Sequence, residues 1–318
     1  MKILVIRFSS IGDILLTFPV VEGLKHKYPF AEIHFLTKPS YKPVLDLLST
    51  NIHSRFLQES LFKTSQQLRR ERYDLVIDLH NNLRTMLLQA LMFQGTWNRF
   101  RKLNFQKFLF TTLKWNTLPK EHVVDRYAKA ANVRPTVVNL TLTNKDKGSE
   151  PLPSKYVAWV LGATFSTKQF PITKLIETIE RINMPVVLLG GEKEIPMANS
   201  LKAHFPSIYS FVGKTTLLEA ASVLSRARVV VTNDTGLMHL AAFYAKPMVC
   251  IWGNTVPAFG MYPYQSELVF HAQVSDLSCR PCSKIGHNTC PKGHFKCMMN
   301  QDSVMISEQI TSLFYEEI

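Results

Sequence analysis

Two short turns, one near each end of the chain, place an acidic side chain between a strand-like run and a helix-like run. Asp13 closes the turn at residues 9–13, and Asp234 lies within the turn at residues 232–236. In a parallel α/β unit such turns lie at the carboxyl edge of the sheet, where ligands bind. Both turns are therefore candidates for binding or catalysis, although an Asp or Thr before a helix is first of all an N-cap.

The second turn lies between the two most strand-like segments of the chain. Three valines at residues 229–231 precede it, an apolar run with helical spacing follows it, and residues 248–252 form another strand-like run. Strand, turn, helix and strand in this order form the repeating unit of a parallel sheet covered by helices. The helix start offers N–H groups and a positive dipole end to a phosphate, and Gly236 lets a ligand approach the backbone.

Three side chains could take part in the chemistry of such a protein. Asp13 could act as a general base, provided that a substrate hydroxyl lies within hydrogen-bonding distance. Lys168 lies in a loop rich in Gly, Ser and Thr, from which its ammonium group could meet a diphosphate. Glu194 follows two glycines and could accept hydrogen bonds from a ribose, or be a solvated residue at a helix start. The P-loop and GxGxxG patterns are both missing from the sequence.

Four cysteines lie close together near the carboxyl end, namely Cys279, Cys282, Cys290 and Cys297. His287 and His294 lie among them. Such a group could hold a structural metal, form disulfides or remain as reduced thiols that pack a loop. A cytoplasmic chain disfavours stable disulfides, and the second cysteine pair lacks the close spacing of a zinc ribbon. Reduced thiols are therefore the first interpretation, and a structural metal is the second.

The alternation of strand and helix patterns predicts two parallel α/β domains. We expect strands at residues 2–7, 33–36, 75–79, 156–161, 186–189, 209–212, 229–231 and 248–252. We expect helices at residues 14–27, 44–48, 61–72, 172–182, 197–204, 217–225, 237–244 and 306–315. Pro19 should kink or shorten the first helix.

The polar segment at residues 144–153 contains Gly and Pro and is typical of a linker. The predicted domains are residues 1–148 and 149–300, with residues 301–318 as a helix that packs back toward the first domain. Two such halves would form a cleft between facing carboxyl edges, a common place for ligands.

The composition indicates a globular protein with an acidic partner. The chain has 318 residues and a formal charge of +13, which favours a nucleic acid, an anionic membrane or a phosphorylated substrate. The first apolar run is short and broken by Arg7, unlike a secretory signal, and no run approaches the roughly 18 apolar residues of a membrane span. We expect a cytoplasmic protein, either free or peripheral on the inner face of the inner membrane.

Residues 79–120 contain no Asp or Glu, but they are rich in basic and aromatic residues. The basic residues are Arg84, Arg99, Arg101, Lys102, Lys107, Lys114 and Lys120. The aromatic residues among them include Trp97, Phe100, Phe105, Phe108, Phe110 and Trp115. A basic, aromatic, amphipathic element suits the surface of an anionic bilayer. A helix pair with inward-facing aromatics and solvated basic side chains explains the pattern equally well.

Four segments, taken together and in this order, resemble glycosyltransferase family nine, the heptosyltransferases of lipopolysaccharide core assembly. They are ILVIRFSSIGDILLTFP, LGATFSTKQFP, LLGGEKE and VVVTNDTGLMHLAAFYAKPMVCIWGNT. The segment DLHNNLRT is also similar, and the cysteine-rich segment is similar to a tail found in some members only. The resemblance covers nearly the whole chain, with a departure at Gly253-Asn254, where the family usually has Gly-Pro.

The resemblance implies a GT-B fold, in which two Rossmann-like parallel α/β domains face a central cleft. It places the acceptor on the first domain and the nucleotide-sugar on the second. It assigns catalytic roles to Asp13, the base, and to Lys168, which meets the donor phosphates. The donor-binding residues that it implies are Gly12, Thr164, Lys168, Glu194, Thr215, Asp234, Thr235, Gly236 and His239. The acceptor-binding residues that it implies are Ser10, Asn81, Arg84 and Arg126.

The resemblance also implies an inverting transfer that uses no cofactor and no catalytic metal. The default donor is ADP-heptose, and the acceptor is a lipopolysaccharide-core or related lipid-linked oligosaccharide. Asp13 would remove the proton of the acceptor hydroxyl, while Lys168 and the helix start at Thr235 would stabilise the departing diphosphate.

Two other functions remain as alternatives. A nucleotide-sugar epimerase with the same fold would turn over its substrate without an acceptor. A basic nucleic-acid-binding protein would use the cysteines as a zinc knuckle, although the loose cysteine spacing and the absence of RNA-binding signatures disfavour it.

Overall fold

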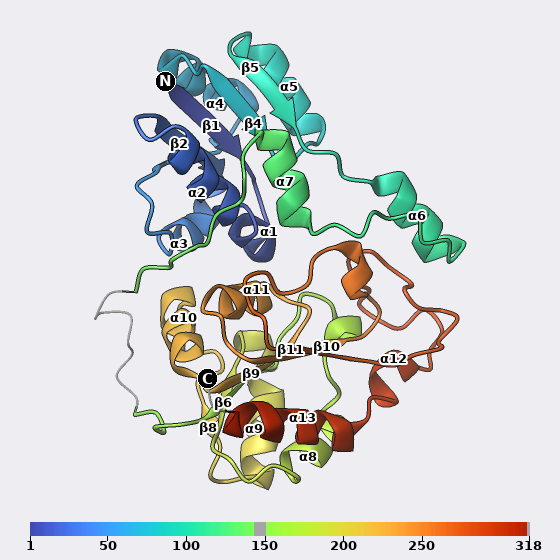
Figure 1. Ribbon diagram of the computed structural model, residues 1–318. Coiled ribbons are helices and arrows are strands. Elements are labelled where there is room, and N and C mark those ends of the chain that lie inside the picture. The colour runs from blue at the N-terminus through green and yellow to red at the C-terminus, as the bar shows by residue number, and fades with distance from the viewer. Residues whose placement is uncertain (143–150, 317–318) are drawn as a thin grey trace. The chain divides into compact units, whose positions relative to one another are not determined.

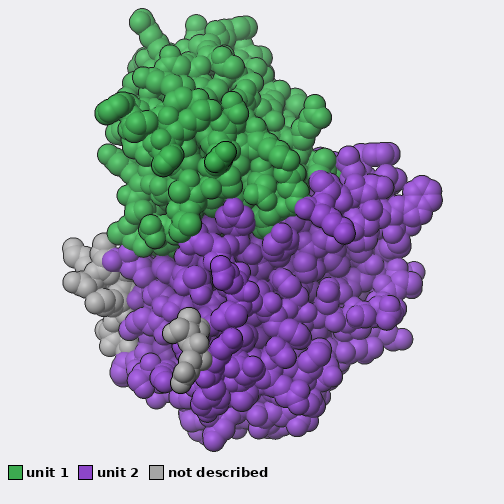
Figure 2. Space-filling view, viewed as in Figure 1, with its two compact units in different colours: residues 1–103, 121–141 green, residues 104–120, 142–318 purple. Residues whose placement is uncertain are grey.

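The computed structural model describes residues 1–142 and 151–316, which form two compact units (Figure 1). Unit 1 comprises Met1–Leu103 and Glu121–Thr141, and unit 2 comprises Asn104–Lys120 and Leu142–Ile318 (Figure 2). The predicted boundary at 148/149 and most of the predicted linker at residues 144–153 lie outside the described residues. The structure differs from the prediction at residues 104–120, which we expected in the first domain and which belong to unit 2.

Unit 1 is built on a parallel sheet in the order β3-β2-β1-β4-β5. The strands are β1 (Lys2–Ile6), β2 (Glu32–Thr37), β3 (His53–Phe56), β4 (Leu75–Asp78) and β5 (Thr96–Arg99). The helices are α1 (Ile11–Leu15), α2 (Phe18–Lys27), α3 (Lys42–Leu45), α4 (Leu61–Glu71), α5 (Leu83–Met92) and α7 (Val123–Ala131), with the short 3-10 helix η1 (Pro39–Tyr41). α4 packs with α5, and α2 packs with α7. The last four residues of β1 are fully buried, as expected for a strand covered on both faces.

The predicted helix at residues 14–27 is two helices. α1 ends at Leu15 and α2 begins at Phe18, with Thr17 between them donating its hydroxyl to the carbonyl of Ile14 at 2.6 Å. Pro19 lies in the first turn of α2, where its missing N–H group has no intrahelical partner to lose. The prediction that Pro19 shortens the helix is therefore confirmed, and Asp13 is left on a one-turn helix directly after β1.

Unit 2 is built on a parallel sheet in the order β11-β10-β9-β6-β7-β8. The strands are β6 (Val157–Val160), β7 (Val186–Leu189), β8 (Tyr209–Ser210), β9 (Val229–Asn233), β10 (Met248–Trp252) and β11 (Val269–Gln273). The α-helices are α6 (Asn104–Thr112), α8 (Ile172–Ile179), α9 (Ile195–His204), α10 (Leu217–Arg226), α11 (Gly236–Phe243), α12 (Lys296–Met299) and α13 (Ser303–Tyr315). The 3-10 helices are η3 (Ser166–Lys168), η4 (Glu192–Glu194) and η5 (Pro257–Phe259).

The last helix belongs to unit 2. α13 lies against α8, β9 and β10, and it buries Ile306, Ile310, Leu313 and Phe314 in the core of that unit. These residues follow the i, i+4, i+7, i+8 spacing of one helix face. We expected residues 301–318 to pack back toward the first domain. The contacts of α13 described here are instead with elements of unit 2.

The predicted basic and aromatic element at residues 79–120 contains α5, β5 and α6. Phe100 is buried and Trp97 is partly buried against the core of unit 1, whereas Phe105, Phe108 and Trp115 are exposed. Neither a bilayer-binding element nor a helix pair with inward-facing aromatics describes the whole stretch. Among the described residues, no helix has both the length and the apolar character that a membrane crossing requires.

Candidate active site

Each sheet has one point where the chain switches direction across it. In unit 1 this point lies between β1 and β4, and in unit 2 it lies between β6 and β9. Ligands of parallel α/β domains bind beyond the carboxyl ends of the strands at such a point. Asp13 follows β1, and Lys168 and Asp234 follow β6 and β9, so the sequence-predicted catalytic residues lie at these two places.

Asp13 is held by two neighbours in the turn after β1. Its Oδ1 lies 2.6 Å from Nη2 of Arg7. Its Oδ2 accepts hydrogen bonds from the hydroxyl of Ser10 at 2.8 Å and from the backbone N–H of Ser10 at 3.2 Å. Asp13 is the third residue of α1, and its carboxylate accepts from the N-cap residue Ser10. The interpretation of Asp13 as the N-cap itself is therefore wrong, and Asp13 also forms an ion pair with Arg7.

Arg7 fixes the position of this carboxylate. Burial disfavours the charged form of Asp13, but the charge of Arg7 and the hydrogen bonds from Ser10 outweigh burial, and the pKa of Asp13 is lowered. The Arg7 guanidinium also donates to the carbonyls of Leu79 at 2.7 Å and Ser9 at 2.8 Å. The sequence analysis missed Arg7 as a site residue, although a charge at the end of an apolar strand was a visible signal.

The end of β4 supplies the other side of the unit 1 site. Oδ1 of the fully buried Asp78 accepts the backbone N–H groups of His80 at 3.0 Å and Asn81 at 2.7 Å. Asn81 has a φ of 43°, a left-handed conformation that Asn tolerates, and its side-chain amide donates to the carbonyl of Phe100 at 2.8 Å. Burial and the charge of Arg7 lower the pKa of His80 to about 3, so this imidazole is neutral at physiological pH.

Of the predicted acceptor-binding residues, Ser10, Asn81 and Arg126 connect to the surroundings of Asp13. The guanidinium of Arg126 lies 4.8 Å from the ring centroid of Phe100 and donates to the carbonyl of Arg101 at 2.8 Å. Phe100 packs edge-on against Tyr127, whose ring lies 5.9 Å from the Arg7 guanidinium. Arg84 is exposed on α5 and shares none of these contacts.

The unit 2 site centres on an ion pair between Lys168 and Asp234. Nζ of Lys168 lies 2.7 Å from Oδ2 of Asp234, and the hydroxyl of Thr255 donates to the same oxygen at 2.7 Å. Asn233 connects the ends of β9 and β6 by donating to the carbonyl of Leu161 at 3.0 Å. Asp234 is therefore neutralised by a lysine and a threonine rather than capping a helix.

The helix that follows this ion pair has the predicted form. Thr235 is the extended N-cap of α11, which begins at Gly236. The first N–H groups of a helix lack intrahelical partners and point out of its end, so an anion at this end would meet backbone donors and the Lys168 ammonium. His239 is buried within α11.

Glu194 is buried rather than solvated. Its carboxylate accepts the backbone N–H of Gly191 at 2.9 Å and the side-chain amide of Gln169 at 3.0 Å. A Cβ at Gly162 would lie 3.0 Å from a Glu194 carboxylate oxygen, so this glycine lets the carboxylate lie against the loop after β6. Gln169 directly follows Lys168 in the chain. The hydrogen bond from Gln169 therefore connects Glu194 to the loop that carries Lys168.

The remaining predicted donor-binding residues take no part in the contacts described above for Lys168, Asp234 and Glu194. Gly12 is buried within α1, in unit 1 rather than in unit 2. Thr164 is exposed in the loop after β6, and Thr215 is partly exposed just before α10.

The cysteine-rich segment forms hydrogen bonds with two loops of the unit 2 site. Thr167 and His287 exchange hydrogen bonds at 2.8 Å and 2.9 Å. Arg280 donates to the carbonyls of Gly253 at 2.6 Å and Thr255 at 3.0 Å. This segment therefore holds both the loop that carries Lys168 and the residue that hydrogen-bonds Asp234.

All four cysteines of this segment, together with His294, line one cavity of about 20 Å³. Sγ of Cys279 lies 3.8 Å from Nε2 of His294. Burial, followed by the neighbouring thiols, raises the pKa of Cys297 to about 11. Thiols and an imidazole are groups that bind zinc, but among the described residues no three of these side chains bring their ligand atoms within 4.8 Å of one another.

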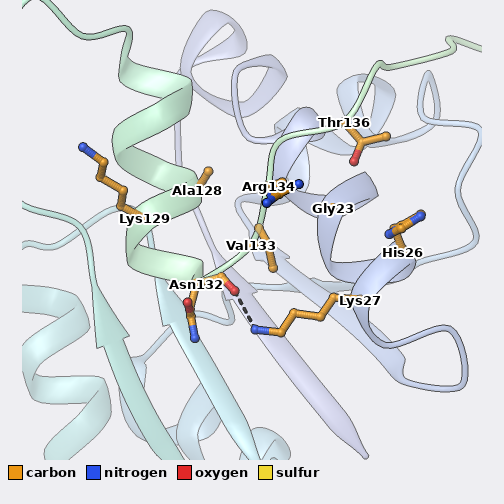
Figure 3. Close-up of a pocket in the computed structure, with 9 residues that line it drawn as sticks. All are labelled: Gly23, His26, Lys27, Ala128, Lys129, Asn132, Val133, Arg134 and Thr136. Atoms are coloured by element: carbon orange, nitrogen blue, oxygen red, sulfur yellow. Dashed lines mark hydrogen bonds between the residues drawn. The ribbon is translucent and has the colours of Figure 1, made fainter.

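Two other features lie away from these sites. A cavity of about 710 Å³ lies in unit 1 between α2 and α7, and no predicted site residue lines it (Figure 3). Figure 3 shows the side chains of Lys129 and His26 on opposite sides of this cavity. At the amino ends of β2 and β3, Glu32, His34 and His53 have side-chain donor atoms within 4.8 Å of one another.

Comparisons with known proteins agree on one family. A model described as glycosyltransferase family 9 (heptosyltransferase) matches residues 61–292. The chain is 25% identical over 295 residues to lipooligosaccharide heptosyltransferase 2 of Haemophilus influenzae, covering 81% of this chain and 85% of the relative.

Solved structures show the same fold. The chain is similar to E. coli ADP-heptose lps heptosyltransferase II, with a TM-score of 0.78, 21% identity and coverage of 99% and 98% of the two chains. It is also similar to a glycosyl transferase family 9 protein of Veillonella parvula, with a TM-score of 0.79, 19% identity and the same coverage. The predicted fold class, with two Rossmann-like parallel α/β domains of the GT-B type, is confirmed.

Proposed function

Because the chain belongs to glycosyltransferase family 9, the heptosyltransferase family, we propose that it transfers heptose from ADP-heptose to a lipid-linked oligosaccharide of the lipopolysaccharide core type. The names of similar proteins support this donor and this class of acceptor. The observation that carries the proposal is the Lys168–Asp234–Thr255 group at the start of α11, which lies within the residues that the family model matches.

In the proposed donor site, the diphosphate lies at the amino end of α11. Asp234 holds the Lys168 ammonium at 2.7 Å, and its own charge is compensated by Lys168 and Thr255. The ammonium and the helix N–H groups then stabilise the negative charge that grows on the departing diphosphate. Glu194 is the proposed partner of the ribose hydroxyls.

In the proposed transfer step, the acceptor hydroxyl oxygen forms a bond to the anomeric carbon as the bond from that carbon to the diphosphate breaks. The hydroxyl proton passes to Asp13, ADP leaves, and the anomeric configuration inverts. A carboxylate whose pKa is lowered is a weak base, so we expect the proton to move late, after the attacking oxygen has become more acidic.

We further propose that catalysis requires no metal ion, since Lys168 and α11 supply the positive charge that the leaving group needs. The acceptor is anionic and lipid-linked, so the net charge of +13 suits it. We place the reaction at the cytoplasmic face of the inner membrane, with the protein bound peripherally.

The test compares two variants in a transfer assay with ADP-heptose and a lipopolysaccharide-core acceptor. Asp13→Asn should lower kcat/KM by about 10²- to 10⁴-fold and leave ADP affinity nearly unchanged, because only the proton acceptor is lost. Lys168→Ala should weaken both ADP binding and transfer, because its phosphate contact exists in the ground state and the transition state.

Matched controls are Asp46→Asn and Lys42→Ala, which change an exposed ion pair on α3. Both should behave as wild type. Wild-type transfer by Asp13→Asn would contradict the base assignment, and failure to bind ADP would contradict the donor site. Conversion of the nucleotide-sugar to an isomer without acceptor would instead favour an epimerase.

A further inference from the structure

Helix α6 is unusual because none of its residues is buried, although it carries three phenylalanines and a leucine. A helix that buries nothing gains little from packing and needs another reason to retain apolar side chains. Its position in unit 2 shows that it is not simply detached from the rest of the protein.

One face of this segment is attached to unit 2. The Phe110 and Phe259 rings pack edge-on with centroids 5.7 Å apart, and Nζ of Lys107 lies 6.0 Å from the same Phe259 centroid. Lys114 donates to the carbonyls of Pro281 at 2.8 Å and Cys279 at 3.2 Å. Residues 107 and 110 are about one helical turn apart on α6, and Lys114 follows the end of the helix at Thr112.

The opposite side presents aromatic residues to solvent. Phe105 is 69% exposed, Phe108 is 57% exposed and Trp115 is 65% exposed. Residues 105 and 108 are one helical turn apart, and residue 105 lies about 140° around the helix axis from residue 110. Single exposed apolar side chains are common on protein surfaces, but a cluster of this kind marks an interaction site.

The charge around this cluster identifies its partner. Residues 79–120 include no acidic side chain, and Arg101, Lys102 and Lys120 flank the helix in sequence. Aromatic side chains that insert among headgroups, together with basic residues that meet anionic lipid, are the two components of interfacial membrane binding. A protein partner would be expected to meet a more mixed set of charges.

We propose that the α6 segment, residues 104–115, is the element by which this protein contacts an anionic bilayer, with Phe105, Phe108 and Trp115 entering the headgroup region. The inference rests on the proposed function only in that a lipid-linked acceptor requires the enzyme to reach a membrane. Phe105, Phe108 and Trp115 are not among the residues that we assign to the donor or the acceptor.

The experiment measures binding of the full-length protein to vesicles of phosphatidylglycerol and phosphatidylethanolamine by sedimentation. Phe105→Ser/Phe108→Ser should lower vesicle affinity by about tenfold or more, since each change removes an aromatic ring from the interface. The matched control is Phe30→Ser/Phe62→Ser, which removes two other exposed rings, 98% and 59% exposed, and should bind as wild type. Because α6 buries none of its residues, the test variant should fold normally.

A second measurement separates this inference from the proposed function. Both double variants should retain wild-type kcat/KM on an acceptor fragment that lacks its lipid. Loss of activity on that fragment would place α6 in the acceptor site and overturn the proposal. Vesicle binding without any sugar transfer would refute the proposed function and leave this inference standing.

Three other outcomes would overturn the inference. Wild-type vesicle affinity of the α6 variant would do so directly. A change in oligomeric state by light scattering, with no change in vesicle binding, would show that a second copy of the chain covers the surface. Loss of vesicle binding in Leu83→Ser/Leu87→Ser alone would assign the contact to the exposed residues of α5.

Discussion

Arg7 determines how Asp13 responds to pH. The ion pair at 2.6 Å and the Ser10 hydrogen bonds lower the pKa of Asp13 against the opposing effect of burial. The carboxylate is therefore ionised throughout the physiological range. We predict that kcat/KM does not fall through protonation of Asp13 above about pH 5. In Arg7→Gln that fall should move to higher pH, because burial, which raises the pKa of Asp13, is then opposed by the Ser10 hydrogen bonds alone. The measurement is the pH profile of kcat/KM.

Ser10→Ala provides a milder form of the same test. It removes one hydrogen bond to Asp13 and should move the limb in the same direction by a smaller amount, even if Arg7→Gln folds poorly. Arg70→Gln is the matched control, since Arg70 is exposed on α4 and has no assigned role in binding or catalysis. A profile that is unchanged in both Arg7→Gln and Ser10→Ala would contradict the assignment of Arg7 as the residue that positions Asp13.

Residues of the two turns could be predicted from the sequence, whereas their partners could not. Asp13, Lys168 and Asp234 each follow a strand, and a strand end is visible in the sequence. Arg7 also donates to the carbonyl of Leu79 after β4, and Thr255 after β10 donates to Asp234 after β9. Such pairings between loops depend on strand order. The side-chain contacts of Asn81 and Arg126 were likewise set by the tertiary position of Phe100.

At the scale of secondary structure, Glu71 connects the end of α4 to two strands. Its carboxylate lies 2.8 Å from Lys2 on β1 and 2.8 Å from Arg55 on β3. The hydrogen bond from Lys2, followed by Arg55, lowers the pKa of Glu71 from 4.5 to about 2. The stabilisation is thus fully present above about pH 4.5 and is lost as pH falls toward about 2.

We therefore predict that Glu71→Gln lowers the free energy of unfolding by about 1 kcal/mol at pH 7, as expected for partly exposed ion pairs. The difference from wild type should shrink as pH falls from about 4.5 toward about 2, because Glu71 becomes protonated first in the unfolded chain and only near the lower pH in the folded protein. Urea unfolding at several pH values measures this. Glu59→Gln, which breaks an exposed pair with Lys63, is the control and should change stability little. A difference that grows on acidification would contradict the prediction.

The cysteine-rich segment is the second element with a testable role. Its four thiols and His294 line one small cavity, and a zinc ion bound there would draw their ligand atoms closer together and release protons from the thiols. We predict that the purified protein holds one equivalent of zinc. Removal of that zinc should lower ADP affinity several-fold, because the segment supports Thr167 and Thr255. Elemental analysis and ADP titration with and without chelator are the measurements.

Cys282→Ser should lose the metal, while Cys250→Ser, which alters a buried thiol in β10 outside the cavity, should retain it. The opposite result is a protein that neither contains nor takes up zinc and whose ADP affinity is unchanged by the chelator. It would support the first interpretation of these cysteines as reduced packing thiols.

The central strands were predictable, whereas three of the four edge strands were not; the exception is β8, which we expected at residues 209–212. β1, β4, β6, β7, β9 and β10 are short apolar runs, which a covered parallel strand requires. The unpredicted strands β3, β5 and β11 all lie at sheet edges, where half of the surface remains open and polar residues are tolerated. The segment at residues 104–120 was assigned to the first half because sequence order does not reveal its contacts with Phe259.

At the scale of the whole molecule, each unit carries its own sheet, core and switch-point site. The proposed reaction requires one unit to hold the acceptor and the other to hold the donor. The ion pair and hydrogen bonds described above for Lys168, Asp234 and Glu194 lie within unit 2. Nucleotide binding should therefore be a property of unit 2, and acceptor binding a property of unit 1.

This division predicts where ligands slow hydrogen exchange of the backbone. ADP should first protect residues 162–169, 190–194 and 233–236, because bound phosphate and ribose reduce local opening of these loops. A delipidated acceptor should protect residues 7–13 and 78–81 instead. Mass spectrometry of the intact chain measures both, and Lys168→Ala should lose the ADP effect while keeping the acceptor effect. Protection by ADP confined to residues 7–13 would reverse the assignment of donor and acceptor to the two units.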